Sequence, residues 1–437
     1  MIKFITHSII SCLVTLFLVS ILLFVFMEAG ADKVAIKKLG IYATPEQYAS
    51  FNSQLGLDES PFIRYADWLL GNDWRAGRKV GRSLVTLKDP KSGEPTWWAM
   101  EDGQPTRWVM NQSKMFKMIR QEDGRTRQIE DLDLQWNKEK RQDGKTVKFF
   151  WGVDDNGNAV KWVRGAGESA WVLRAGGLQK MGDGPSRYIP LRKGLFRGDP
   201  GKSIQYNRPV AKTLINRLKN SFILAGAAFL VIMPAALFLG IIAGVFQGRL
   251  LDRAISFFSL AAAATPDYVS GLFLIIVLGI WAKWVPPVTV FLSDNAIFEN
   301  PTSLILPVLT LTAVELGYII RITRASLVEV MGAPYIRTAI VKGMPEWRVI
   351  FVHAVRNSLI APVTVIMLHT NWLIGGLVVT EVLFGFPGLG TYIYDAAIFG
   401  DFNAVSAAAM LTIGFSVLTR LAGDFSYTLL NPRIRYE

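Results

Sequence analysis

Hydrophobic residues gather into long, nearly uncharged runs that polar segments separate. The first run, Ile9–Met27, contains no charged residue. A helix that rises about 1.5 Å per residue crosses the roughly 30 Å of a bilayer core with a run of this length. Five further runs of this kind are Ser221–Phe246, Ile255–Ala282, Leu304–Ile320, Leu359–Thr380 and Asn403–Thr419. The pattern predicts an all-α polytopic membrane protein with six transmembrane helices.

The first run has an alternative interpretation, because Ala29-Gly30-Ala31 resembles a signal-peptidase site. However, the apolar core exceeds the 7–15 residues or so of a signal peptide. We therefore expect residues 1–27 to be a retained transmembrane helix.

A long polar region follows the first run, and its hydrophobic pattern changes within it. Residues 28–84 have helical spacing: Thr44-Pro45-Glu46 is a helix start, with a cap, a proline and an acid. Residues 85–185 alternate apolar and polar positions, the two-residue period of half-buried strands. Asn156-Gly157 lies between two such runs and predicts a hairpin. We expect a β-rich domain inserted between the helical segment and a return segment at 186–219.

Tryptophan is concentrated in the predicted insert. Seven of the 13 tryptophans lie there, namely Trp97, Trp98, Trp108, Trp136, Trp151, Trp162 and Trp171. They form either the core of a small sheet or an aromatic surface for a ligand, and the sequence leaves both interpretations open.

The charged residues give the expected orientation in the membrane. Lys and Arg occur in Gln247–Ala254, in Arg321–Arg356 and in the tail, whereas Val285–Thr302 and Glu381–Phe402 contain none. The positive-inside rule then predicts cytoplasmic termini and an extracytoplasmic insert. Although the net charge is +12, no basic run of five residues occurs, which argues against nucleic-acid binding. One cysteine and three scattered histidines predict no disulfide framework and no metal site.

The segment Tyr335–Pro362 is a polar, basic insert between two apolar runs. We expect a helix over Pro334–Lys342, a turn at Gly343 and a second helix toward the membrane, with Pro345 in its first turn. Helical spacing puts the apolar residues of the second helix on one face and the polar ones on another. The apolar set is Val349, Val352, Val355 and Leu359, and the polar set is His353, Arg356 and Asn357. Chemistry alone leaves two interpretations, a docking surface for a soluble partner or an ordinary cytoplasmic loop.

This segment resembles the loop that defines permease subunits of bacterial ABC importers. The residues that carry the resemblance are Tyr335, Arg337, Thr338, Ala339, Gly343, His353, Ala354, Arg356, Asn357 and Pro362. They are similar to the dipeptide, oligopeptide and nickel branch. The resemblance covers 1–84 loosely and 187–437 closely, and implies a permease core at 220–437. Within it, residues 334–362 would be the coupling loop to ATPase subunits, with Lys342 among the coupling residues.

The same resemblance gives the outer end of the bundle a role. Glu381, Phe384, Pro387, Gly388 and Gly390 match an outer segment that implies a gate scaffold, although a plain exposed turn remains the alternative. The C-terminal residues Asp424, Tyr427 and 432–435 also match, with Asn431 and Arg420 as departures.

Acidic residues within spans are costly and are functional candidates by default. Asp267 and Glu315 lie within predicted spans. We name both, with Glu381, as candidates for the translocation path, and pairing within a helix interface is the alternative.

The resemblance implies a non-catalytic subunit that forms half of a path for peptides or a similar small solute. Its implied partners are a homologous second permease, two ATPase subunits that carry ATP and Mg, and a periplasmic solute-binding protein, all at the bacterial inner membrane and its lipid. This chain itself has no expected cofactor: Gly201-Lys202-Ser203 lacks the earlier glycine of a phosphate-binding loop. The competing hypothesis is a membrane-anchored extracytoplasmic binding or sensor protein.

Overall fold

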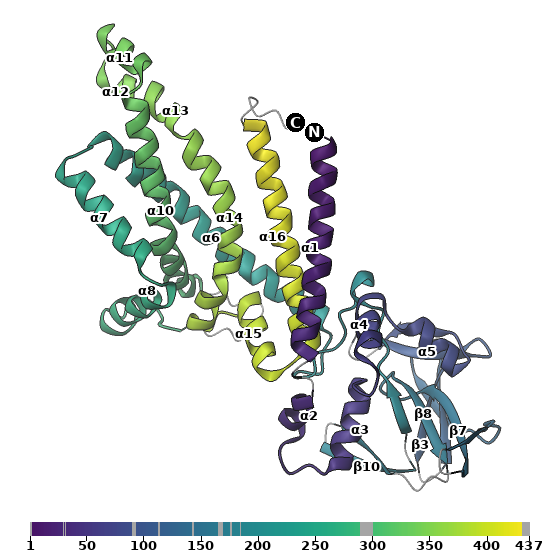
Figure 1. Ribbon diagram of the computed structural model, residues 1–437. Helices are drawn as coiled ribbons and strands as arrows, with labels where there is room; N and C mark the ends of the chain where they lie inside the picture. Colours follow the sequence, from purple (N-terminus) through teal and green to yellow (C-terminus); the bar gives the residue numbers. More distant parts are fainter. Residues whose placement is uncertain are drawn as a thin grey trace. The chain divides into compact units, whose positions relative to one another are not determined.

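The computed structural model describes residues 2–28, 30, 32–89, 93–111, 114–141, 144–164, 169–174, 177–183, 185–288 and 300–430 (Figure 1). The chain divides into two units. The helical unit comprises Met1–Val19, Leu214–Asp395 and Ala408–Glu437, and the mixed unit comprises Ser20–Thr213 and Ala396–Ala407. Parts of the predicted outer loop, the tail at 431–437 and residues 29 and 31 of the possible cleavage site lie outside the described residues.

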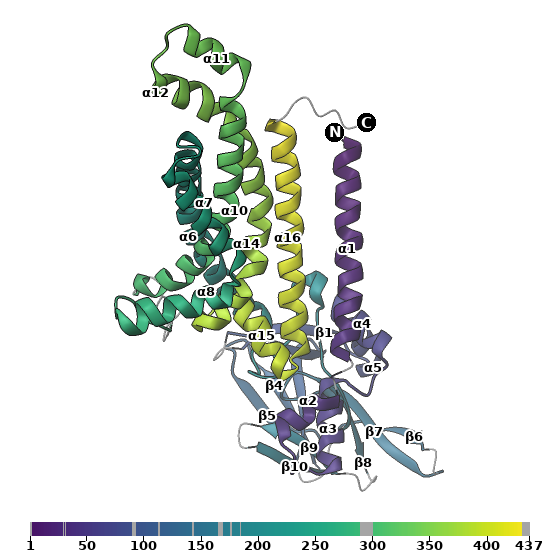
Figure 2. The same cartoon turned by 60° about the vertical axis from the view of Figure 1, so that its left-hand side comes forward.

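The helical unit consists mainly of helices, some of which continue into the mixed unit (Figures 1 and 2). They are α1 (Ile2–Glu28), α6 (Val210–Val245), α7 (Leu250–Ala264), α8 (Asp267–Leu274), α10 (Ile305–Met331), α14 (Ile360–Phe384), α15 (Leu389–Phe399) and α16 (Phe402–Leu430). A π-helical segment, η2 (Ile275–Trp281), continues α8, and a short 3-10 helix, η3 (Pro301–Leu304), precedes α10. In the described part of the chain, four helices are long and apolar enough to cross a bilayer, or up to seven if each of three bent pairs is one span. The predicted number of six falls between these limits.

The prediction of one continuous span at Ile255–Ala282 is wrong, because the structure has two helices there with a sharp bend between them. Helices α7 and α8 meet at 109°. Thr265 ends α7 with an extended backbone, φ −88° and ψ 127°, and Pro266 follows it. A residue before proline is disfavoured in the helical region, so the chain turns there. A hydropathy run records only composition and cannot show the bend.

Glycines let the helices of this unit approach closely. A Cβ atom at Gly317 of α10 would lie 2.1 Å from the carbonyl oxygen of Ser259 in α7. A Cβ atom at Gly240 of α6 would lie 2.5 Å from Thr323 in α10. Small residues at such crossings are typical of membrane helix interfaces. The close contacts hold α10 between α6 and α7.

Four short helices precede the strands of the mixed unit. They are α2 (Asp32–Leu39), α3 (Pro45–Leu55), α4 (Pro61–Leu70) and α5 (Asp73–Val80). The predicted cap at Thr44 is confirmed: its hydroxyl accepts from the backbone N–H of Gln47 at 3.3 Å, and its N–H donates to the Gln47 side chain at 2.7 Å. This reciprocal pair fixes the start of α3.

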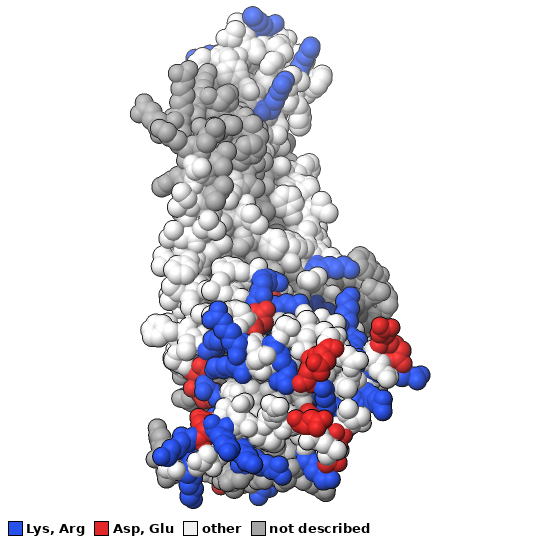
Figure 3. Space-filling model, turned by 90° about the vertical axis from the view of Figure 1, so that its right-hand side faces the viewer, with Lys and Arg blue, Asp and Glu red and all other residues white. Residues whose placement is uncertain are grey.

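The strands form three antiparallel sheets. A five-stranded sheet has the order β1 (Leu84–Lys88), β2 (Pro95–Glu101), β3 (Gln104–Asn111), β4 (Lys114–Arg120), β5 (Thr126–Glu130). A four-stranded sheet has the order β11 (Pro185–Ile189), β8 (Ala159–Arg164), β7 (Thr146–Val153), β6 (Asn137–Lys140), and β10 (Gly177–Asp183) pairs with β9 (Ser169–Arg174). After β11 the chain makes a 3-10 turn, η1 (Leu195–Arg197), and leads to α6. On the face shown in Figure 3, charged side chains gather over this unit, whereas the helical unit is largely uncharged.

Strands occupy much of the stretch at 85–185 where the sequence predicts a β-rich insert. The strands begin at Leu84 and end at Ile189, rather than at 85 and 185, and α6 begins inside the predicted return segment. The hairpin at Asn156-Gly157 is confirmed, with Gly157 at φ +82° between β7 and β8. The alternating pattern continues from 127 to 136, but strand β5 ends at Glu130, and residues 131–136 form no strand.

Most of the tryptophans form the core between the sheets. Trp108 and Trp162 are fully buried against Phe150, and Trp136 and Trp151 pack on the same cluster. Gly152 is required there, because a Cβ atom would lie 2.9 Å from the rings of Phe150 and Trp108. The core interpretation therefore holds for these residues.

Asp154, at the end of β7, makes the stability of this core depend on pH. Its carboxylate is buried, and burial raises the pKa of Asp154 to about 7. The unfolded pKa is about 3.9, so the folded state binds the proton more tightly. This contribution to stability is full below about pH 4 and disappears as the pH rises through about 7.

We expect Asp154→Asn to remove this dependence. The wild-type free energy of unfolding should fall by up to about 4 kcal/mol more than that of the variant between pH 4 and 7.5. Urea titrations followed by tryptophan fluorescence measure the difference. Parallel pH profiles for the two proteins would contradict the assignment.

Candidate functional site

The polar segment after α10 folds as a helix pair. Helix α11 (Pro334–Val341) is followed by Gly343 at φ +75° and then by α12 (Glu346–Arg348), with Pro345 as its N-cap. The chain continues without a break through a π-helical segment, η4 (Val349–Val355), and α13 (Arg356–Ser358) into α14. The predicted helix, turn and helix are confirmed, with Pro345 one residue before the first turn. Figure 2 shows the pair at the end of α10.

The predicted apolar face of the second helix is partly wrong. Val349, Ile350, Ala354 and Val355 are buried, whereas Val352 is 45% exposed. A π-helix closes its hydrogen bonds from i to i+5, so residues five apart share a face. The pairs 349/354 and 350/355 have this spacing. A period of 3.6, which the sequence prediction assumed, puts Val352 on the wrong side.

The predicted coupling residues divide between the base of the pair and its surface. Ala339 is buried in the cluster with Ile336 and Leu327. The amide of Asn357 donates to the hydroxyl of Tyr335 at 3.0 Å, so these two predicted residues join the helices. The side chains of Arg337, Thr338, Lys342 and Arg356 are exposed, with Gly343, and His353 is half-buried.

Sequence reasoning missed the apolar part of this surface. Val341 is 82% exposed, Trp347 63%, Phe351 61% and Ile340 57%. We call these four residues the apolar ridge. Exposed large apolar side chains in a polar surface segment are candidates for contact with a partner. A tryptophan between Glu346 and Arg348 in a basic insert was the available signal.

Glu381 of α14 organises the outer segment. Its carboxylate accepts from the hydroxyl of Ser221 in α6 at 2.5 Å, and from the backbone N–H groups of Gly390 at 2.6 Å and Thr391 at 3.2 Å. Ser221 in turn accepts from the N–H of Leu389 at 2.7 Å. A fully buried carboxylate thus joins α6, α14 and the start of α15. We call this arrangement the Glu381 latch.

The predicted gate residues surround the latch. Phe384 is buried, and the carbonyl oxygen of Pro387 accepts from the Asn220 amide at 2.9 Å. A Cβ atom at Gly388 would lie 2.1 Å from the Glu381 carboxylate, and one at Gly390 would lie 2.5 Å from the Val378 Cα atom. The motif is therefore a bent helix pair, α14 and α15 at 78°, rather than an exposed turn.

The other two acidic candidates lie at different places. Asp267 is the first residue of α8, just after the bend, where its negative charge complements the helix dipole. Glu315 is buried in the middle of α10. Of the three, Glu381 accepts a hydrogen bond from Gly390, one of the predicted gate residues.

An ion pair that the sequence did not reveal fastens α7 to α10. Arg324 Nε lies 2.5 Å from Asp252 Oδ1, and Nη2 lies 2.7 Å from Oδ2. Asp252 also accepts from the N–H of Gly248 at 2.8 Å. Such two-point geometry fixes orientation as well as distance. The described residues include no group of three His, Cys, Asp or Glu side chains that would hold a metal ion.

A bundle of membrane-length helices, a projecting helix pair with an exposed ridge and a bent outer segment define a transport subunit rather than an enzyme. Comparison with known proteins agrees. The model described as "Binding-protein-dependent transport system inner membrane component" matches residues 236–436, and the model for the N-terminal part of such components matches residues 1–84. The chain belongs to this family of multi-pass inner membrane components. Residues 85–235, which include the β-rich insert, lie between the matched ranges.

Curated relatives support the same assignment. The probable peptide ABC transporter permease protein y4tP of Sinorhizobium fredii is 32% identical over 252 residues, 58% of this chain and 80% of the relative. The dipeptide transport system permease protein DppB of Escherichia coli K12 is 31% identical over 274 residues, 57% of this chain and 81% of the relative. The oligopeptide transport system permease protein AppB of Bacillus subtilis is 31% identical over 265 residues, which are 59% of this chain and 84% of the relative.

Proposed function

We propose that this chain forms half of the translocation path of an ATP-driven importer for peptides or similar small solutes. The names of the relatives supply the peptide class. The partners would be a homologous second permease, two ATPase subunits that bind ATP and Mg, and a periplasmic solute-binding protein. Both termini and the helix pair α11–α12 would then be cytoplasmic, and the insert periplasmic.

The observation that carries the proposal is the apolar ridge on α11–α12. Its buried base, with Ile336, Val349 and Ala354, packs against Leu327 of α10. Because the base is packed and α12 continues into α14, a force on the ridge is transmitted along two long helices. Val341 and Trp347 remain exposed, as a docking surface requires. An ATPase that grips the ridge would therefore move the bundle.

The pair Val341→Glu and Trp347→Glu tests the proposal. Both side chains are exposed, so the fold should persist, whereas a charge in the centre of an apolar interface removes a binding hot spot. We expect at least about a tenfold loss of co-purified ATPase, since hot-spot residues contribute about 2 kcal/mol or more. Uptake of a labelled peptide into proteoliposomes should fall in parallel.

Leu132→Glu is the matched control, because Leu132 is 83% exposed in the mixed unit and lies outside the ridge. It should retain both ATPase binding and uptake. Wild-type chain that recruits no ATPase, or ridge variants that recruit it undiminished, would refute the docking role.

A further inference from the structure

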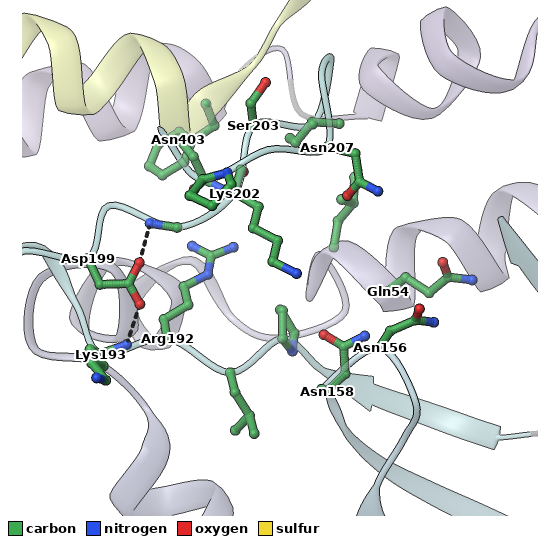
Figure 4. Close-up of a pocket in the computed structure, with 18 of the residues that line it drawn as sticks. Gln54, Asn156, Asn158, Arg192, Lys193, Asp199, Lys202, Ser203, Asn207 and Asn403 are labelled. Atoms are coloured by element: carbon green, nitrogen blue, oxygen red, sulfur yellow. Dashed lines mark hydrogen bonds between the residues drawn. The ribbon is translucent and has the colours of Figure 1, made fainter. Parts of the chain in front are cut away.

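The mixed unit contains a cavity of about 1040 Å³ whose lining residues all belong to that unit. Pockets that hold small ligands have volumes of about 300–1,000 Å³, so this one accommodates a molecule of short-peptide size. Figure 4 shows Lys202 extending into it, Arg192 beside Lys202, and Gln54, Asn156 and Asn158 across from them. Lys202 and Arg192, with Asp199 near them, thus lie on one side of the cavity, and amides lie on the other.

The backbone at Lys202 is fixed by its neighbours. Its carbonyl oxygen accepts from the Asn403 amide at 2.7 Å, and the preceding Gly201 donates its N–H to Asp199 at 3.0 Å. Gly201 has φ +92°, and a Cβ atom there would lie 3.1 Å from the Asn403 side chain. These contacts use main-chain groups, so the Lys202 ammonium is left to the cavity.

Arg192 is fixed in a similar way. Its N–H donates to the Asn72 side chain at 2.9 Å, and its carbonyl oxygen accepts from the Asn72 N–H at 3.1 Å. Burial lowers the pKa of Arg192, and the nearby carboxylates of Asp67 and Asp199 oppose this effect. An anion at the guanidinium would offset part of the cost of burying its charge.

Three other cations that line the cavity already have polar partners. Arg64 pairs with Glu28, and Arg197 pairs with Asp73, with Nη2 2.6 Å from Oδ1. Lys38 donates to the carbonyl oxygen of Gln205 at 3.0 Å. By contrast, the charged groups of Lys202 and Arg192 donate no hydrogen bond to any residue that the structure describes. The charged groups of Lys202 and Arg192 are thus available to an anionic group in the cavity.

The opposite wall carries amides. Asn156 and Asn158 lie in and after the β7–β8 turn, and Gln54 lies on α3, where its amide nitrogen donates to the Trp171 carbonyl oxygen at 2.6 Å. Side-chain amides both donate and accept, so they match the N–H and C=O groups of a peptide. Apolar lining from Trp97 and Leu191 completes the site.

We propose that this cavity binds a short peptide by its terminal carboxylate, which Lys202 and Arg192 hold, while the amide wall contacts the peptide groups. The peptide part of this inference rests on the proposed function. A lipid phosphate offers the same charge, but the amides of Gln54, Asn156 and Asn158 favour a ligand with peptide groups.

Direct binding tests the proposal without any ATPase. The full chain is placed in phosphatidylcholine nanodiscs, and a tripeptide with an N-terminal fluorophore is titrated by fluorescence anisotropy. Lys202→Met with Arg192→Met should weaken binding about 10- to 100-fold, which is the range for loss of hydrogen bonds to charged groups. The same peptide with a C-terminal amide should bind the wild-type chain about as weakly.

Three further measurements keep the result decisive. Lys138→Met, on exposed β6, should bind like the wild type. Lys202→Met alone should retain the wild-type thermal melt, because Lys202 itself is held through its main-chain carbonyl group, and it should still lose most of the affinity. Inorganic phosphate should compete weakly, and vesicles with phosphatidylglycerol should not displace the peptide.

Equal affinity for acid and amide peptides, or unchanged binding by Lys202→Met, would overturn the inference. Displacement by phosphatidylglycerol vesicles but not by unlabelled peptide would assign the site to a lipid and overturn it too. Val341→Glu and Trp347→Glu distinguish failure of this inference from failure of the proposed function. These variants should lose ATPase binding and uptake, whereas the cavity should still bind peptide.

Discussion

Glu381→Ala is expected to abolish uptake and to lower the stability of the helical unit by about 3 kcal/mol or more. The substitution leaves the Ser221 hydroxyl and the N–H groups of Gly390 and Thr391 without their buried acceptor. Each unsatisfied buried group costs about 1–3 kcal/mol. Without the latch, nothing among these contacts holds the start of α15 against α6 and α14. Uptake by proteoliposomes and thermal melting in detergent measure the two effects.

Glu381→Gln separates the latch from a role in the path. The glutamine oxygen can still accept from Gly390 and Thr391, and its amide can donate to Ser221. We therefore expect it to keep most of the stability and at least about a fifth of the uptake, since an amide that keeps these hydrogen bonds costs about 1 kcal/mol or less. Folded Glu381→Gln protein that transports no better than Glu381→Ala would show that the charge itself is needed. That outcome would restore the path interpretation.

The elements that the sequence predicted best depend on local chemistry. The cap at Thr44 needs only Gln47 three residues later, and the hairpin at Asn156-Gly157 needs only its own dipeptide. The apolar runs likewise give the membrane helices, because length and composition decide whether a helix can span.

The features that the sequence missed depend on partners distant in the chain. The latch joins Glu381 to Ser221, 160 residues away, and the Asp252–Arg324 pair spans 72 residues. No periodicity reports such contacts. The π-helical segment at 349–355 was missed for another reason, because its period differs from the one assumed. The cavity at Lys202 was missed for the first reason, since α3, the β7–β8 turn and the return segment meet only in the folded unit.

Gly343→Pro is expected to uncouple the chain from its ATPases while the rest of the molecule stays folded. Gly343 has φ +75°, which proline cannot adopt because its ring holds φ near −65°. Proline also removes the N–H that donates to the Ile340 carbonyl oxygen at 2.9 Å, and it disfavours the near-helical backbone of Lys342. The turn would open, and Trp347 on α12 would lose its position relative to Val341 on α11.

Gly343→Ala is the matched control. A Cβ atom at this position meets nothing within 4 Å, so alanine suffers only the left-handed backbone penalty of about 1–2 kcal/mol. We expect the alanine variant to retain at least about a tenth of the wild-type ATPase binding and the proline variant to retain none that pull-down detects. Peptide binding by the Lys202 cavity should be unchanged in both, because those lining residues belong to the mixed unit. If Gly343→Pro recruits ATPase and supports uptake normally, the ATPase does not recognise the turn geometry. The helix pair α11–α12 would then not be the point of coupling.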